Sequence, residues 1–135
     1  MNFLSHSVQE TRKIGAEVAK TAKPGDVFAL EGALGCGKTE FARGFVEALA
    51  GPSTVRSPTF SIINIHETPE FPVYHFDFYR LKKSEELVEI GYYDCIRGDG
   101  VSLIEWADMF PLALPVGVRH IRFVDHGDNN REILM

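Results

Sequence analysis

The chain of 135 residues has few of the features that would tie it to a membrane or to an oxidising compartment. Its two cysteines, Cys36 and Cys95, are too few for a disulfide framework or a thiolate metal site, which favours a reducing compartment. No apolar run approaches the roughly 20 residues that a membrane-spanning helix needs. The first residues also lack the charged and apolar regions of a signal peptide. We therefore expect a single domain over residues 1–135 with a cytoplasmic location.

Positive charge is also scarce. The sequence has 14 Lys and Arg residues against 19 Asp and Glu, a formal net charge of −5, and no basic run longer than Lys82-Lys83. Proteins that bind nucleic acid through their own surface neutralise its phosphates with clustered basic side chains. We therefore expect any role on RNA to be indirect, through a partner protein.

What the chain does have is a complete G-x-x-x-x-G-K-[ST] segment, which spans Gly32 to Thr39. It follows an apolar run, Val27–Leu30, that predicts a buried strand. Apolar residues then recur at helical spacing from Lys38 to Leu49. This strand-loop-helix order is the context that a phosphate-binding loop requires.

The residue types in this segment suit the binding of a nucleotide with Mg²⁺. Glycines allow successive N–H groups, here those of Leu34, Gly35, Cys36 and Gly37, to point at phosphate oxygens at the start of a helix. Lys38 is expected to reach the β- and γ-phosphates, and the Thr39 hydroxyl to bind Mg²⁺. The alternative is a glycine-rich turn with a surface lysine, which the four matched positions in their expected context disfavour.

The remaining pattern predicts an α/β domain with a P-loop NTPase-like, three-layer arrangement and a mixed sheet, parallel at its centre. An antiparallel hairpin is expected at one edge. The expected helices begin after the capping residues Ser7 and Ser84, in addition to the helix that follows the loop. The expected strands are 27–30, 60–65, 73–79, 101–104, 116–124 and 131–135, with a turn at 126–130.

Two acids lie where a phosphate loop needs a carboxylate, at the end of a neighbouring strand. Glu105 ends the apolar run Val101–Ile104, and Asp77 lies in an alternating segment that places His75, Asp77 and Tyr79 on one face. Each acid could instead cap a helix or face solvent. His75 and Asp77 could form a metal pair, but without a third ligand a histidine on a strand face is favoured.

Two further residues are candidates for contact with the nucleotide. Thr59, in Ser57-Pro58-Thr59, lies in the connection after the loop helix, where switch-like segments approach the γ-phosphate. Alternatively, the Thr59 hydroxyl could form a local side-chain-to-backbone turn at the start of a strand. Trp106, the only tryptophan, directly follows Glu105. A lone tryptophan more often packs in the core than against a ligand.

These motifs, in this order, closely resemble the bacterial TsaE family over essentially the whole chain. They are 32–39, Arg43-Gly44, the S-P-T-F segment from Ser57, the YHFDFYRL segment from Tyr74, the Glu86–Gly91 segment and Ile104-Glu105-Trp106. The resemblance implies an ATPase in the synthesis of threonylcarbamoyladenosine at position 37 of tRNA, with TsaB and TsaD proteins as partners. It further implies that Lys38 and Thr39 bind phosphate and Mg²⁺, Glu105 supports the metal and Asp77 assists hydrolysis. Thr59 and Trp106 would then lie close to the nucleotide.

The sequence departs from the family at two positions and leaves two other functions open. Family loops usually have an acid where this chain has Ala33, and often a hydroxyl where it has Glu40, so the hydrolysis rate is less certain than binding. A small-molecule kinase would need an arginine-rich lid, whereas the arginines here are scattered. A regulatory subunit that binds nucleotide but hydrolyses little is the other alternative. The absence of an N-K-x-D guanine motif favours ATP.

Overall fold

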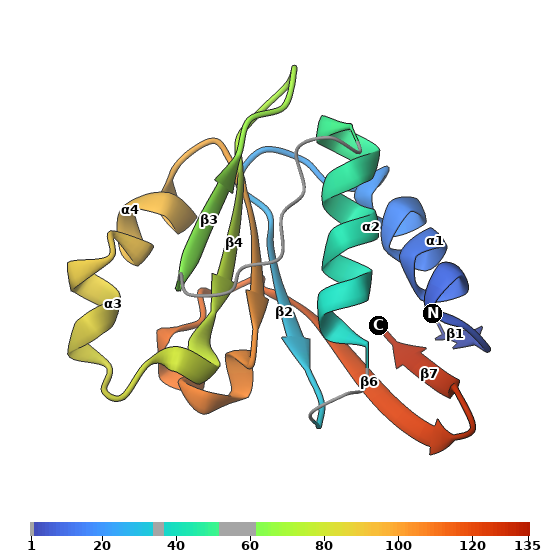
Figure 1. The fold of residues 1–135 in the computed structure, drawn as a ribbon. Helices are drawn as coiled ribbons and strands as arrows, with labels where there is room; N and C mark the ends of the chain where they lie inside the picture. The colour runs from blue at the N-terminus through green and yellow to red at the C-terminus, as the bar shows by residue number, and fades with distance from the viewer. Residues whose placement is uncertain (1, 34–36, 52–61) are drawn as a thin grey trace.

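A computed structural model describes residues 2–33, 37–51 and 62–135, and within them seven strands form one mixed sheet (Figure 1). The strand order across the sheet is β1-β7-β6-β2-β5-β4-β3. The strands are β1 (Asn2–Ser5), β2 (Val27–Glu31), β3 (Ile63–His66), β4 (Val73–Asp77), β5 (Val101–Glu105), β6 (Arg119–Gly127) and β7 (Asn130–Leu134).

The predicted parallel centre and antiparallel edges are both confirmed. Strands β6, β2, β5 and β4 run parallel, while β3 pairs antiparallel with β4, and β7 with β6 and β1. The β6–β7 turn has Asp128 and Asn129 at φ values of 52° and 66°, which is the two-residue hairpin geometry that asparagine and aspartate tolerate. Because the central strands are parallel, their carboxyl ends share one edge of the sheet.

One face of the sheet is covered by α1 (Val8–Ala19) and α2 (Lys38–Ala50), which lie side by side in Figure 1. As predicted, the Ser7 side chain caps α1 by accepting a hydrogen bond from the Glu10 N–H, at 3.1 Å. The two helices approach closely through glycine. A Cβ added to Gly44 would collide with the Arg12 carbonyl oxygen, and one added to Gly15 would collide with that of Phe41.

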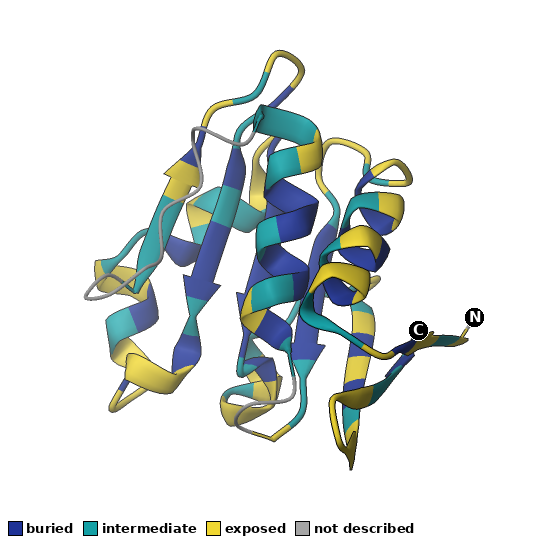
Figure 2. Ribbon diagram, turned by 45° about the vertical axis from the view of Figure 1, so that its right-hand side comes forward, coloured by how far each residue is buried: buried dark blue, intermediate teal, exposed yellow. Residues whose placement is uncertain are grey.

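The opposite face carries α3 (Glu85–Glu89), α4 (Tyr92–Arg97) and the 3₁₀ turns η2 (Phe78–Arg80), η3 (Ala107–Met109) and η4 (Pro111–Ala113). Tyr92 is fully buried among aromatic rings, and its hydroxyl donates to the Ala113 carbonyl at 3.0 Å. Figure 2 shows buried residues along the central strands and exposed ones at the β6–β7 hairpin. None of the helices in the described ranges is long and apolar enough to cross a bilayer.

Three sequence expectations are wrong in detail. The strand expected over 73–79 ends at Asp77, whose side chain accepts from the Tyr79 N–H and turns the chain into η2. Tyr79 therefore does not share a strand face with His75. Ser84 makes no side-chain capping bond, because the N–H groups of Glu86 and Leu87 donate to the backbone carbonyls of Lys83 and Ser84 instead. The last long strand begins at Arg119 rather than at residue 116.

Candidate functional site

The predicted site residues that the structure describes gather at the carboxyl edge of the parallel strands. The loop begins after β2, and Glu105 and Asp77 end β5 and β4. Glu105 is the Cα partner of Leu30 on one side and of Asp77 on the other. Three consecutive strands of the sheet therefore bring the loop and both acids to one place.

Gly37 ends the loop and starts α2 in a conformation that favours glycine. Its φ is 99°, in the left-handed region, and it occupies the N-cap position of α2 without a side-chain capping bond. A Cβ there would lie 3.1 Å from Cδ of Arg131, which packs against this glycine from β7. The N-cap of α2 thus provides no side-chain capping bond to the first N–H groups of the helix, the kind of helix start at which anions bind in proteins.

Lys38 is the first residue of α2, and its side chain folds back over the loop. Its Nζ donates to the carbonyl oxygens of Gly32 and Ala33, the latter at 3.0 Å. The same Nζ lies 3.8 Å from the centroid of the Trp106 ring, which is a cation–π contact. The residue is only 4% exposed, so the ammonium is held against these partners and does not extend into solvent.

Thr39, Glu105 and His75 form a chain of hydrogen bonds that links α2 to the two acid-bearing strands. The Thr39 hydroxyl donates to Oε1 of Glu105 at 2.8 Å. Oε2 of the same carboxylate lies 2.6 Å from Nε2 of His75. Glu105 and His75 are both buried, with side chains 6% and 7% exposed. The predicted Mg²⁺ ligands Thr39 and Glu105 are therefore in direct contact.

The environment of Glu105 keeps it ionised although it is buried. Burial acts to raise its pKa, but the hydrogen bond from His75, the His75 charge, the hydrogen bond from Thr39 and the Lys38 charge together outweigh it. The pKa of Glu105 is consequently lower than its ordinary value. An ionised carboxylate beside a threonine hydroxyl is a set of hard oxygen ligands of the kind that Mg²⁺ prefers.

Asp77 lies beside this chain but is not part of it. Its carboxylate accepts from the Tyr79 N–H at 3.1 Å and from Nε of Arg80 at 3.4 Å, and its side chain is 21% exposed. The capping role that the sequence left open is thus real. One strand away from Glu105 and open to solvent, the carboxylate is also accessible to a water molecule at the site.

Trp106 directly follows Glu105 and has a φ of 59°, which is unusual for a bulky residue. Its ring contacts both Lys38 and Tyr79, and the centroids of the two aromatic rings lie 4.9 Å apart. The indole thus lies against the loop lysine while it also packs, partly buried, against the core cluster that includes Phe78. Such outliers concentrate at functional sites.

Two groups of expected residues cannot be placed. Leu34, Gly35, Cys36 and Thr59 lie outside the described residues.

Among the residues that are described, no cluster of three or more His, Cys, Asp or Glu side chains could hold a metal ion. The His75–Asp77 metal pair considered from the sequence therefore gains no third ligand there.

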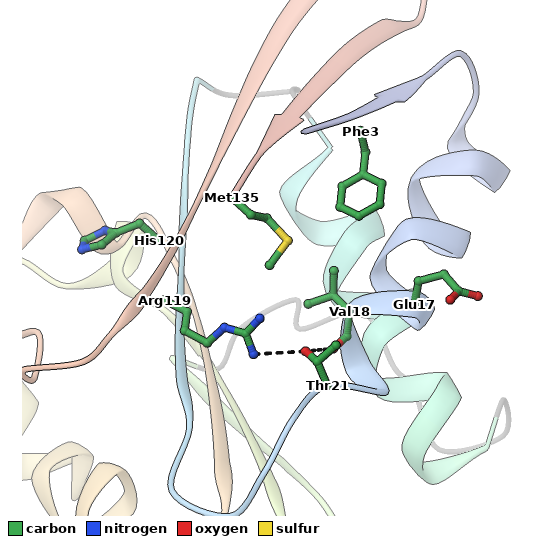
Figure 3. Close-up of a pocket in the computed structure, with 7 residues that line it drawn as sticks. All are labelled: Phe3, Glu17, Val18, Thr21, Arg119, His120 and Met135. Carbon is green, nitrogen blue, oxygen red and sulfur yellow. Dashed lines mark hydrogen bonds between the residues drawn. The ribbon is translucent and has the colours of Figure 1, made fainter. Parts of the chain in front are cut away.

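A cavity of about 630 Å³ lies elsewhere on the molecule (Figure 3). Phe3, Val18 and Met135 provide apolar walls, and Arg119 reaches across to donate to the Thr21 hydroxyl at 3.0 Å. Arg119 pairs with Phe28 near the start of β2, whereas the phosphate loop follows the end of that strand. This cavity is therefore at the opposite end of the sheet from the acids and the loop.

The fold and the loop define an α/β domain of the P-loop NTPase-like class, and comparison with known proteins narrows the class further. The family profile of "Threonylcarbamoyl adenosine biosynthesis protein TsaE" matches residues 5–133. The chain therefore belongs to the TsaE family, a family of tRNA threonylcarbamoyladenosine biosynthesis, as the resemblance of its motifs indicated.

Individual relatives agree with this assignment. The chain is 42% identical to the TsaE protein of Bacillus subtilis strain 168, over 93% of this chain and 78% of the relative. It is 35% identical to that of Treponema pallidum Nichols, over 98% of each. The crystal structure of Bacillus subtilis YdiB superposes with a TM-score of 0.81 at 37% identity, covering 98% of this chain and 82% of that one.

Proposed function

We propose that this chain is a Mg²⁺-dependent ATPase that supports threonylcarbamoylation of adenosine 37 in tRNA by acting on a TsaB–TsaD complex. The observation that carries the proposal is the Thr39–Glu105 hydrogen bond, because it joins the loop helix to the acid-ended strand at 2.8 Å. The family and the names of the relatives support the tRNA-modification role.

The residues have distinct roles in this proposal. The N–H groups of Leu34, Gly35, Cys36 and Gly37 bind the phosphates, and Lys38 exchanges its carbonyl partners for phosphate oxygens. Thr39 and Glu105 hold Mg²⁺, which neutralises phosphate charge when bound. Asp77 orients or deprotonates the attacking water. Thr59 and Trp106 border the nucleotide.

The test is phosphate release from ATP by the purified chain, with Mg²⁺ or with EDTA. We expect slow release that requires Mg²⁺ and disappears in Lys38→Ala. Lys20→Ala is the matched control, since Lys20 is exposed and its ammonium pairs with nearby Glu17. Equal release by the wild type and Lys38→Ala would exclude the loop as the catalytic site. Acceptor-dependent ADP production would instead identify a kinase.

Binding is measured separately, because a regulatory subunit would bind without turnover. A ligand at a thousandfold excess over its dissociation constant stabilises the fold by ~4 kcal/mol. We therefore expect Mg-ATP to raise the melting temperature of the wild type and of Lys20→Ala, but not that of Lys38→Ala. A full thermal shift without phosphate release would favour the regulatory role.

A further inference from the structure

His75 is the one member of the hydrogen-bond chain that the proposed function does not use. It lies on β4, two residues before Asp77, and its ring is 7% exposed. Sequence reasoning treated it as an ordinary strand-face histidine. The structure instead directs its Nε2 at the carboxylate of Glu105, 2.6 Å from Oε2.

We infer that His75 is a positioning residue that fixes the Glu105 carboxylate for Mg²⁺ through the Nε2–Oε2 hydrogen bond. This inference rests on the proposed function, because it concerns the metal site proposed there. Since an ionised carboxylate only accepts hydrogen bonds, His75 Nε2 is the donor. Thr39 binds the other oxygen, Oε1, so the two partners fix the carboxylate from two different elements, α2 and β4.

The burial of Glu105 makes this bond matter more than it would at the surface. The residue is 4% exposed, so a lone pair without a donor cannot be satisfied by bulk water. Without the His75 donor, the carboxylate is free to rotate about its hydrogen bond to Thr39, and this loss of orientation weakens its hold on a cation. Partners of this kind, which orient a ligand to a metal, typically contribute 10- to 100-fold in metal affinity.

Two amide substitutions separate this role from simple packing. In His75→Gln the side-chain amide nitrogen stands where Nε2 stood, so the donor is kept. In His75→Asn the amide is as polar but reaches only to the Nδ1 position, too short for Glu105. If His75→Asn does not fold, His75→Met replaces it, as it fills the space without a donor.

The experiment measures calorimetrically the dissociation constant of a non-hydrolysable ATP analogue with Mg²⁺ and with EDTA. The readout is the dissociation constant of the analogue in EDTA divided by its dissociation constant in Mg²⁺. The melting temperature of each nucleotide-free variant is recorded alongside. We expect His75→Asn to lower this ratio about tenfold, with the EDTA constant changed less than about twofold. His75→Gln should restore most of the wild-type ratio.

Each outcome separates the inference from the proposed function. A wild-type ratio above one that is unchanged in His75→Asn overturns the positioning role and leaves the proposed function standing. A His75→Gln ratio as low as that of His75→Asn also overturns it, because the donor would then not be the feature that matters. A wild-type ratio of one removes the Mg²⁺ site itself, and the proposed function fails with it.

Discussion

At the scale of single residues, the site gives very different surroundings to two carboxylates that end neighbouring strands. Glu105 is buried and bonded through both oxygens, to Thr39 and His75. Asp77 is partly exposed and bonded to the turn that follows it. Two acids in such different surroundings are suited to different tasks, a fixed metal ligand and a group that handles water or protons.

We predict that Asp77→Asn and Glu105→Gln have different kinetic consequences. Asparagine still caps the turn at Tyr79, so Asp77→Asn should fold, bind nucleotide with nearly unchanged affinity and lose ~10²-fold or more in turnover. Glu105→Gln should instead weaken Mg²⁺-dependent binding. The measurements are calorimetric binding and phosphate release with both variants. Loss of affinity in Asp77→Asn with unchanged turnover of bound nucleotide would mean that the two roles are reversed.

At the scale of elements, α1 and α2 depend on glycine where they cross. A Cβ at Gly44 would collide with the Arg12 carbonyl, which is backbone and cannot rotate away. Alanine normally favours a helix over glycine by about 1 kcal/mol. At this position the close approach of the two helices reverses that preference, because the helices must separate to admit a methyl group.

Gly44→Ala is accordingly expected to destabilise the fold by about 2 kcal/mol, as overpacking does. Urea denaturation of the purified variant measures this change. The control is Ala48→Gly, at an exposed position of the same helix, which should cost about 1 kcal/mol by helix propensity alone. A stabilised Gly44→Ala variant would mean that the helices are not in contact at this point.

Tyr92 links α4 to η4 and predicts a pH dependence. The pKa of Tyr92 is raised above its ordinary value of about 10, mainly by burial and to a smaller extent by the neighbouring Tyr93. The unfolded chain therefore loses this proton first as the pH rises. The contribution of Tyr92 is full below pH ~10 and is lost as the pH climbs toward the folded-state pKa.

The comparison with Tyr92→Phe isolates this contribution. At pH 8 the variant should be about 1 kcal/mol less stable, because the hydrogen bond to Ala113 is gone. Above pH 10 the difference should shrink, since only the wild type can ionise at this position. Urea denaturation at several pH values gives the result, and a constant difference up to pH 11 would contradict it.

Strong local patterns allowed the main elements to be predicted from sequence, while long-range contacts set the rest. The capping of α1 by Ser7 and the strand-loop-helix order are local, and both are confirmed. Strand β1 was missed because Asn2–Ser5 is too short to show a period and is defined by its pairing with β7. Helix α4 was missed for a similar reason, as it is only six residues long after Gly91.

The candidate site follows the same rule. Glu105 could be predicted because it ends an apolar run, and Asp77 because it lies in an alternating segment; both patterns are visible in sequence. The role of His75 could not, because it depends on the register that places β4 beside β5. Alternation put His75 and Asp77 on one face, but only the pairing brings that face to Glu105. Knowledge of the β4–β5 pairing would have been needed to predict the contact between His75 and Glu105.

At the scale of the whole molecule, the acidic composition constrains how the chain could serve tRNA modification. With a formal net charge of −5, the chain repels a polyanion more than it attracts it. Under the proposed function, we therefore expect the energy of hydrolysis to reach the RNA through partner proteins. The proposed site lies at the carboxyl ends of the central strands, where a loop that changes conformation on hydrolysis could pass that change to a bound partner protein.

We predict slow ATP hydrolysis by the isolated chain and no measurable tRNA binding at physiological salt. Adding TsaB and TsaD proteins should stimulate turnover and sustain repeated rounds of modification, which Lys38→Ala should not support. The assay counts modified tRNA per TsaD molecule with wild-type and variant chains. Equal multiple-turnover yields would refute the ATP-driven role, and salt-resistant tRNA binding would refute the argument from charge.

The pairing of β1 with β7 also bears on how the chain reaches its fold. The four residue pairs between these strands run from Asn2–Leu134 to Ser5–Arg131, and they close a loop that contains nearly all of the chain. The entropy lost in closing a loop grows with its length, and contacts between distant residues slow folding. We therefore expect this edge to assemble only after the central strands have ordered most of the intervening chain.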